Sequence, residues 1–214
     1  MPFPEQVTLH RESLFVRAPL SKARRALRAA LGISHRTDYV YAVLLEFSQR
    51  YGGPLSILEF GAPDGDAFAS LAAATHQTSL SDRVLVHAFR NRAGRGSAAR
   101  TRYPNLRIHY GLFADTLNEA TLATLRSDLP ILVCFDAADY SSTRLPFERL
   151  LPYLPDGCVI CLDEAPRRSK RNQGEARLVS EVNHGMFGTD LELVLDVRLS
   201  HDARRVYRFV RGKG

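Results

Sequence analysis

The sequence predicts an α/β fold, in which a Rossmann-like sheet of mostly parallel strands carries helices on both faces. Short apolar runs alternate with helical patterns from residue 55 onward, which is the rhythm of βαβ units. Several of these runs are apolar at every position, as expected for strands covered on both faces. A chain of 214 residues with 45% hydrophobic content is long enough for one full domain with a sizeable core.

Two helical segments come before the sheet. Residues 21–32 (SKARRALRAALG) and 37–53 (TDYVYAVLLEFSQRYGG) have apolar side chains at helical spacing, and the second segment ends at a pair of glycines. We expect residues 1–36 to form an N-terminal helical extension and residues 37–214 to form the main domain.

Five short apolar runs predict the parallel strands of the sheet. They are LSILEF (55–60), VLVHAF (84–89), LRIHY (106–110), ILVCF (131–135) and CVICL (158–162). Two longer runs near the end of the chain, residues 191–200 and 204–211, are separated by the short turn HDA and predict an antiparallel hairpin. Seven strands are therefore expected.

The charge balance favours acidic partners only weakly. The chain has 29 Lys and Arg residues against 23 Asp and Glu residues, which gives a formal net charge of +6. We expect the basic segments 90–102 and 165–173 to be loops that contact an anionic substrate or solvent. Nucleic-acid binding ranks last, because no RNA-binding module or base-stacking motif accompanies these segments. The expected partner is a small-molecule acceptor, and assembly into a homo-oligomer stays open.

Cysteine usage and hydropathy predict a soluble, cytoplasmic protein without a membrane partner. Three cysteines, an odd number, fit a reducing compartment better than a disulfide framework. The sequence has no leader-like apolar region and no run of 18 apolar residues that could span a membrane. Cys134, Cys158 and Cys161 are expected in the core, because strand residues three positions apart face opposite sides and do not form a zinc site.

A glycine-containing turn follows the first predicted strand. Glu59, Gly61 and Gly65 form the pattern E-x-G-x-x-x-G, after which DAFASLAAATHQ begins a helix. The glycines permit a tight turn and a close approach of the backbone to a ligand, and the helix presents free N–H groups beside it. The pattern differs from the dinucleotide-binding and P-loop motifs. A ligand site is one interpretation, and a structural turn capped by Asp64 is the other.

Acidic residues follow two of the predicted strands. Asp136 comes directly after the run 131–135, and Asp163 and Glu164 come directly after the run 158–162. Neighbouring parallel strands lie about 4.8 Å apart, so their carboxyl ends bring these side chains close together. Carboxylates placed together repel unless a cation lies between them, and Mg²⁺ suits such oxygen ligands. The alternative is that the three acids cap the following helix and loop.

Several of these segments resemble the class I S-adenosylmethionine-dependent methyltransferases. The turn after the first strand, YGLFADTL, FDAADYSST and LPYLPDGCVICLDE are together similar to the macrocin O-methyltransferase family, over roughly residues 37–211. The resemblance implies a seven-stranded sheet of order 3-2-1-4-5-7-6 with the last strand antiparallel. It also implies methyl transfer from S-adenosylmethionine, with Mg²⁺, to a hydroxyl of a sugar or glycosylated natural product.

The resemblance also implies which residues form the site. The metal ligands would be Asp136, Asp163 and Glu164. The residues that would line the methyl-donor pocket are Glu59, Gly61, Ala62, Asp64, Gly65, Phe89, Arg90, Phe113 and Asp136. Phe113, with Asp115, could border the adenine or simply begin a helix.

The chain departs from the family pattern at two positions. Ala138 stands where the family has an acidic base, which leaves Asp139, Tyr140 and His184 as candidate catalytic residues. Tyr140 could instead join Ser141 and Ser142 in capping a helix that starts near Thr143.

The second departure is Arg90, where the family has an acid that accepts hydrogen bonds from the donor's ribose. Arginine has no acceptor, so it cannot replace those bonds. The two departures support an alternative function: a catalytically degenerate methyltransferase-fold protein that acts as a binding or assembly subunit in a biosynthetic pathway.

Overall fold

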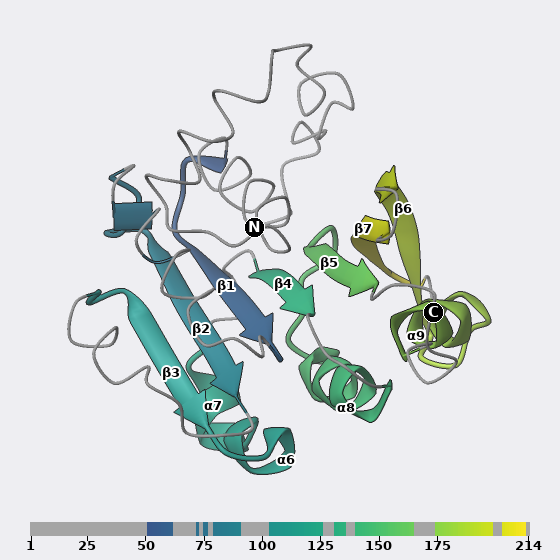
Figure 1. Cartoon of the computed structure of the whole chain (residues 1–214), viewed down its shortest axis with the longest axis horizontal. Coiled ribbons are helices and arrows are strands. Elements are labelled where there is room, and N and C mark those ends of the chain that lie inside the picture. The colour runs from purple at the N-terminus through teal and green to yellow at the C-terminus, as the bar shows by residue number, and fades with distance from the viewer. Residues whose placement is uncertain are drawn as a thin grey trace.

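The computed structural model of the chain is shown in Figure 1. It describes residues 51–61, 72, 75–76, 79–90, 103–125, 131–135, 140–164, 174–198 and 203–212. The predicted helix at residues 21–32, most of the helix at 37–53 and the proposed domain boundary at residue 36 lie outside these residues.

The sheet has the predicted order. Its strands are β1 (Leu55–Phe60), β2 (Val84–Arg90), β3 (Leu106–Tyr110), β4 (Ile131–Phe135), β5 (Val159–Glu164), β6 (Thr189–Arg198) and β7 (Ala203–Arg211). They are arranged β3-β2-β1-β4-β5-β7-β6, with β1 to β5 parallel and β7 antiparallel to both of its neighbours. The predicted α/β fold, strand order and antiparallel last strand are all confirmed.

Strand β5 continues past the apolar run that predicted it. The run ends at Leu162, but the strand includes Asp163 and Glu164, whose backbones pair with Arg204 and Ala203 of β7. The pairing explains the extension, because an antiparallel neighbour supplies hydrogen-bond partners beyond the apolar part of the strand. The two acids are therefore the last residues of β5 rather than the first residues after it.

Four helices with complete bounds are described: α6 (Phe113–Thr116), α7 (Glu119–Ala123), α8 (Tyr140–Leu150) and α9 (Gly174–Asn183). Helix α7 begins after Asn118, whose side-chain oxygen accepts a hydrogen bond from the Thr121 amide at 2.9 Å. Helix α8 begins three residues before the predicted start near Thr143, so Ser141 and Ser142 lie in its first turn and do not cap it. None of these helices is long and apolar enough to cross a membrane.

The core under α6, α8 and α9 contains a row of stacked rings that crosses four strands. His109, Phe89, Phe60 and Phe135 lie on neighbouring strands in direct register. Their ring centroids are 4.4, 4.7 and 5.3 Å apart in that order. The ring of Phe113, in α6, packs edge-on against Phe60 at 5.6 Å. We call the four rings on the strands the aromatic row, and it marks the carboxyl ends of these strands.

The cysteines are core residues, as predicted. Cys134, Cys158 and Cys161 are free thiols and all are buried. Burial in the core raises the pKa of Cys161 to about 12, because the thiolate loses its hydration. Burial also raises the pKa of Cys158, so Cys158 and Cys161 are protonated and inert at neutral pH.

Candidate active site

The carboxyl ends of β1, β2, β4 and β5 form one edge of the sheet, which we call the rim. Phe60 pairs in register with Phe89 on one side and with Phe135 on the other, and Phe135 pairs with Leu162. The residues that follow this row are thus level with one another along the rim. They include Gly61 and Asp163, whereas Asp136, the residue after Phe135, lies outside the described residues.

The rim contains the point at which the chain changes direction across the sheet. Strand β1 is followed in the chain by β2 on one side, and β4 pairs with β1 on the other side. Open α/β sheets form their ligand crevices at such switch points, outside the carboxyl ends of the strands. The glycine turn after β1 and the acidic segments after β4 and in β5 belong to this place in the topology.

Gly61 has a backbone conformation that suits glycine. Its φ angle is +91°, in the left-handed region, and its amide donates a hydrogen bond of 3.4 Å to the carbonyl oxygen of Phe89. A side chain at this position would strain the backbone. The turn predicted from the sequence therefore begins immediately after β1, while Ala62, Asp64 and Gly65 lie outside the described residues.

Two charged residues next to this turn are buried. Glu59 is 1% exposed in β1, and Arg90, the last residue of β2, is 8% exposed. Glu59 pairs in register with Ala88, so by strand alternation Glu59 and Arg90 lie on the same face of the sheet, opposite the aromatic row. Arg90 is thus part of the strand and not of the basic loop that follows.

Phe89 and Phe113 are core residues in the structure. Phe89 is fully buried between the rings of Phe60 and His109, which cover both of its faces. Phe113 begins α6 and is 4% exposed. Both rings are thus core residues, and their lining of a donor pocket stays a prediction.

The candidate metal ligands can be placed only by their backbones. Asp163 and Glu164 end β5 at the rim, and the structure does not describe their side chains or any part of Asp136. Among the residues whose side chains are described, no group of three or more His, Cys, Asp and Glu side chains could hold a metal ion. The register of Phe135 with Leu162 is the observation that agrees with a shared carboxylate site.

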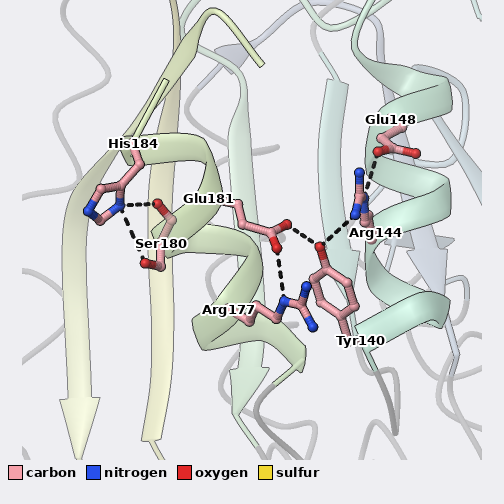
Figure 2. A network of polar contacts seen from close by, with 7 residues as sticks. All are labelled: Tyr140, Arg144, Glu148, Arg177, Ser180, Glu181 and His184. Carbon is pink, nitrogen blue, oxygen red and sulfur yellow. Dashed lines mark hydrogen bonds and ion pairs between the residues drawn. The ribbon is translucent and has the colours of Figure 1, made fainter. Parts of the chain in front are cut away.

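Tyr140 takes part in a polar network between α8 and α9, drawn in Figure 2. Its hydroxyl donates a hydrogen bond to Glu181 and accepts one from Arg144 at 3.1 Å. The guanidinium carbon of Arg177 lies 4.1 Å from the centre of the tyrosine ring, and Arg177 also donates to Glu181 at 2.8 Å. We call Tyr140, Arg177 and Glu181 the helix clasp.

The network favours a neutral phenol and an ionised carboxylate. Partial burial, followed by the hydrogen bond to Glu181, raises the pKa of Tyr140 above its usual value. The same hydrogen bond is the main reason that the pKa of Glu181 is lowered. The proposed role of Tyr140 as a catalytic base does not fit, because its hydroxyl already donates to one residue and accepts from another.

His184 lies at the end of the sheet opposite the rim, beside the amino end of β5. It follows Asn183, the last residue of α9, whose side-chain oxygen accepts a hydrogen bond from the Leu191 amide at 3.0 Å. Leu191 pairs with Phe209, and Phe209 is hydrogen-bonded to Cys158, just before β5 begins. The expectation that His184 reaches the rim is wrong, because α9 runs back along the sheet and ends at the amino end of β5.

Some polar residues near the rim were not anticipated from the sequence. Glu175, in the first turn of α9, is buried at 5% exposure, and an acid in that position is usually explained by the helix dipole alone. No pattern in the neighbouring sequence indicated that Arg177 and Glu181 would contact Tyr140. An open hollow of about 410 Å³ lies against α9, where Ala176, Arg177, Ser180 and Glu181 line it.

Comparison with known proteins identifies structural but not sequence relatives. No protein-family model and no curated protein matches the sequence. The structure is similar to cofactor-bound Rv0187 from MTB, with a TM-score of 0.57, 15% identity, and coverage of 92% of this chain and 91% of that chain.

Two further solved structures are natural-product methyltransferases. CalS11, a TDP-rhamnose 3'-O-methyltransferase of calicheamicin biosynthesis, is 18% identical with a TM-score of 0.57, covering 88% of this chain and 93% of that one. MycE, from the mycinamycin pathway and in complex with Mg, SAH and mycinamycin VI, is 12% identical with a TM-score of 0.56. That match covers 88% of this chain and 54% of MycE, so the chain spans about half the length of MycE. The strand order and these similarities together show that the chain has the class I methyltransferase fold.

Proposed function

We propose that the protein is an S-adenosylmethionine-dependent O-methyltransferase that acts on a small polyhydroxylated metabolite, such as a sugar or a glycosylated natural product. The observation that carries the proposal is the left-handed turn at Gly61, at the switch point of the sheet and level with the end of β4. Similar folds occur in CalS11 and MycE, which are named for methyl transfer in the biosynthesis of such compounds.

The methyl donor is proposed to lie over the turn after β1. Glu59, Gly61, Ala62, Asp64 and Gly65 are the candidate contacts, and they occupy the end of β1 and the residues that follow. Glycines without a Cβ allow the donor to approach the backbone closely. Glu59 is the last residue but one of β1 and is buried on the face of the sheet opposite the aromatic row.

The metal is proposed to bind to Asp136, Asp163 and Glu164. Carboxylate oxygens are the ligands that Mg²⁺ prefers, and the register of β4 with β5 is consistent with a shared site. When bound, such an ion lowers the pKa of a coordinated hydroxyl and offsets the negative charge that develops on its oxygen.

The reaction is a displacement at the methyl carbon. The bond between the methyl carbon and the sulfonium sulfur breaks while a bond to the acceptor oxygen forms, and the hydroxyl proton passes to a base. The protein contributes alignment of the two reactants. Asp139 is the remaining candidate base, because Tyr140 is held by Glu181 and Arg144 and His184 lies at the far edge of the sheet.

The proposal is tested by binding and turnover of the purified chain. We expect S-adenosylhomocysteine to bind in calorimetry with micromolar affinity, and Asp136→Ala to abolish Mg²⁺-dependent methylation of sugar nucleotides and glycosylated acceptors. Asp190→Ala is the matched control, since Asp190 is an exposed residue of the edge strand β6. Turnover that persists undiminished in EDTA would contradict the metal role.

A second function is supported by Arg90. Its guanidinium is buried at the end of β2 and offers no acceptor to ribose hydroxyls, so a methyltransferase-fold subunit that binds a partner is the competing proposal. Under this proposal neither S-adenosylmethionine nor its demethylated product raises the Tm, and the chain co-purifies with another protein of its pathway. Methylation by the isolated chain would eliminate it.

We also propose a cytoplasmic location. Three buried cysteines remain as free thiols in the structure, which is typical of proteins in reducing compartments.

A further inference from the structure

We propose that the helix clasp, Tyr140, Arg177 and Glu181, positions the catalytic segment for the reaction by fixing the first turn of α8 against α9, to Arg177 in the first turn of that helix and to Glu181 in its last turn. The inference rests on the proposed function, because the candidate metal ligand Asp136 and the candidate base Asp139 lie in the four residues that connect β4 with Tyr140. The clasp residues themselves are positioning residues and are not proposed to touch the substrate.

The clasp is located where α8 leaves the rim. Helix α8 begins five residues after the last residue of β4, so its N-terminal end must lie near the carboxyl end of that strand. In Figure 2, Tyr140 and Arg177 lie at one end of the two helices, whereas Glu148 and His184 lie toward the other end. The contact of Tyr140 with Arg177 is thus made at the end of the helices that faces the rim, and Glu181 lies one turn farther along α9.

The rest of the helix interface is apolar. Phe147 and Leu150 of α8 and Leu178 and Val182 of α9 are all fully buried in one core cluster. Apolar contacts of this kind hold the helices together but constrain their rotation and sliding weakly, because the hydrophobic effect is non-directional. Defined orientation at the rim therefore needs directional contacts, and the clasp supplies them.

Each contact of the clasp fixes a different degree of freedom. The hydrogen bond from the Tyr140 hydroxyl to Glu181 joins residues 41 positions apart in sequence and sets the distance between the helices. Arg177 covers one face of the tyrosine ring and donates to Glu181, so the ring cannot rotate away without losing two interactions. Arg144, which is not part of the clasp, also donates to the same hydroxyl from the next turn of α8.

The electrostatics of the clasp support this arrangement. The carboxylate of Glu181 is only 13% exposed and has a cation, Arg177, within hydrogen-bond distance. A charge-assisted hydrogen bond is shorter and more directional than a neutral one. Ionised Glu181 and neutral Tyr140 are therefore matched as acceptor and donor throughout the neutral pH range.

The test compares variants of the full chain by two independent measurements. Tyr140→Phe removes the hydroxyl and keeps the ring for Arg177; Glu181→Ala removes the acceptor; Glu181→Gln keeps an acceptor oxygen without the charge. Glu148→Gln makes the same chemical change at the far end of α8, where Glu148 contacts only Arg144 among the hydrogen bonds of Figure 2. Amide hydrogen exchange of α8 reports its positioning, and methyl-transfer kinetics report its consequence.

We expect Tyr140→Phe and Glu181→Ala to speed amide exchange in the first turns of α8 and to lower kcat by about 10- to 100-fold, the cost of misplacing a reacting group. Glu181→Gln should retain part of the activity, and Glu148→Gln should match the wild type in both measurements. Affinity for S-adenosylhomocysteine should change less than kcat in all four variants, because most of the proposed donor contacts lie on β1 and in the turn that follows it, away from Asp136.

Three results would overturn the inference. Exchange and kcat that stay at wild-type values in Tyr140→Phe and Glu181→Ala would show that the clasp positions nothing. A fall in kcat with unchanged exchange would make Tyr140 a direct participant, and faster exchange with unchanged kcat would separate the clasp from the reaction. A wild-type chain without turnover would defeat the proposed function alone, and the exchange measurement would then decide whether the clasp orients α8.

Discussion

The aromatic row and the helix clasp stabilise their parts of the structure by different kinds of interaction. Across β3, β2, β1 and β4 the last layer of the core is the aromatic row, whose rings stack without a hydrogen bond between Phe60, Phe89 and Phe135. Between α8 and α9 the polar contact is the helix clasp, in which Tyr140 and Glu181 are joined by a directional hydrogen bond. The aromatic row is therefore stabilised mainly by the burial of apolar surface, whereas the clasp mainly fixes the relative orientation of two helices.

Because of this difference, mutations in the two regions should affect stability and function differently. A buried ring contributes free energy in proportion to its area, so its removal should lower stability strongly whatever the reaction does. An exposed or half-buried polar contact contributes little to stability, and its loss is felt in geometry. Mutations in the aromatic row and near the clasp should therefore separate a loss of stability from a loss of function.

The largest effect is expected from Phe60→Ala, at the centre of the aromatic row. Phe60 is completely buried and contacts Phe89, Phe135 and Phe113. We expect the free energy of unfolding to fall by about 3–5 kcal/mol, measured by urea denaturation, because the truncation leaves a cavity among rings. Leu112→Ala, at a side chain that is 63% exposed near the same rim, is the control and should change stability by less than about 0.5 kcal/mol. Equal losses in the two variants would remove the basis of the comparison.

A smaller effect is expected from pH, through the histidine pair at the end of the row. His87 is 2% exposed, and its Nδ1 lies 3.1 Å from Nε2 of His109. Burial, then the neighbouring His109 and Arg107, lower the pKa of His87 from 6.5 to about 4. Protonation therefore favours the unfolded chain, in which the pKa is the higher of the two.

The stability contributed by neutral His87 is present above pH 6.5 and is lost as the pH falls toward 4. At about 1.4 kcal/mol for each pKa unit, the loss should reach about 3 kcal/mol. Urea denaturation at pH 7 and at pH 4.5 measures it, and His87→Leu should flatten this part of the dependence. A wild-type profile equal to that of His87→Leu would contradict the assignment.

The smallest effect is expected from Glu148→Gln, on α8 but away from the clasp. Glu148 pairs with Arg144 at 2.7 Å, and both side chains are 37% exposed. Pairs of this kind, four residues apart on a helix surface, gain little because water and salt screen them. Scanning calorimetry should show no measurable change of Tm. A clear fall of Tm would mean that the surface pair contributes stability that we assign to the clasp and to the core.

Several features of the fold could be predicted from short stretches of sequence. The runs LSILEF, LRIHY and ILVCF match β1, β3 and β4 residue for residue. The central strands β1 and β4 are mostly apolar because helices cover both of their faces, whereas the edge strand β3 alternates between buried and exposed residues. Gly61 was anticipated as a turn residue, and its φ angle of +91° is the reason. The burial of the three cysteines followed from the same local pattern.

Other features depended on contacts between distant residues and were missed. The end of β5 was set by pairing with β7, forty residues later, and not by its own hydropathy. Tyr140 was interpreted as a base or a capping residue because its partner, Glu181, lies on another helix. His184 was expected at the rim because the sequence gives the length of α9 only roughly and does not give the edge of the sheet at which α9 ends.

By itself, the sequence determined the order and type of the elements and the glycine turn after the first strand, because hydrophobic period and backbone conformation are properties of neighbouring residues. Only the tertiary structure decided which polar groups meet. The burial of Phe89 and Phe113 and the contact of Tyr140 with another helix were set by packing, which determines which face of each side chain is covered. Such packing depends on pairs of residues far apart in the chain, and no local pattern records them.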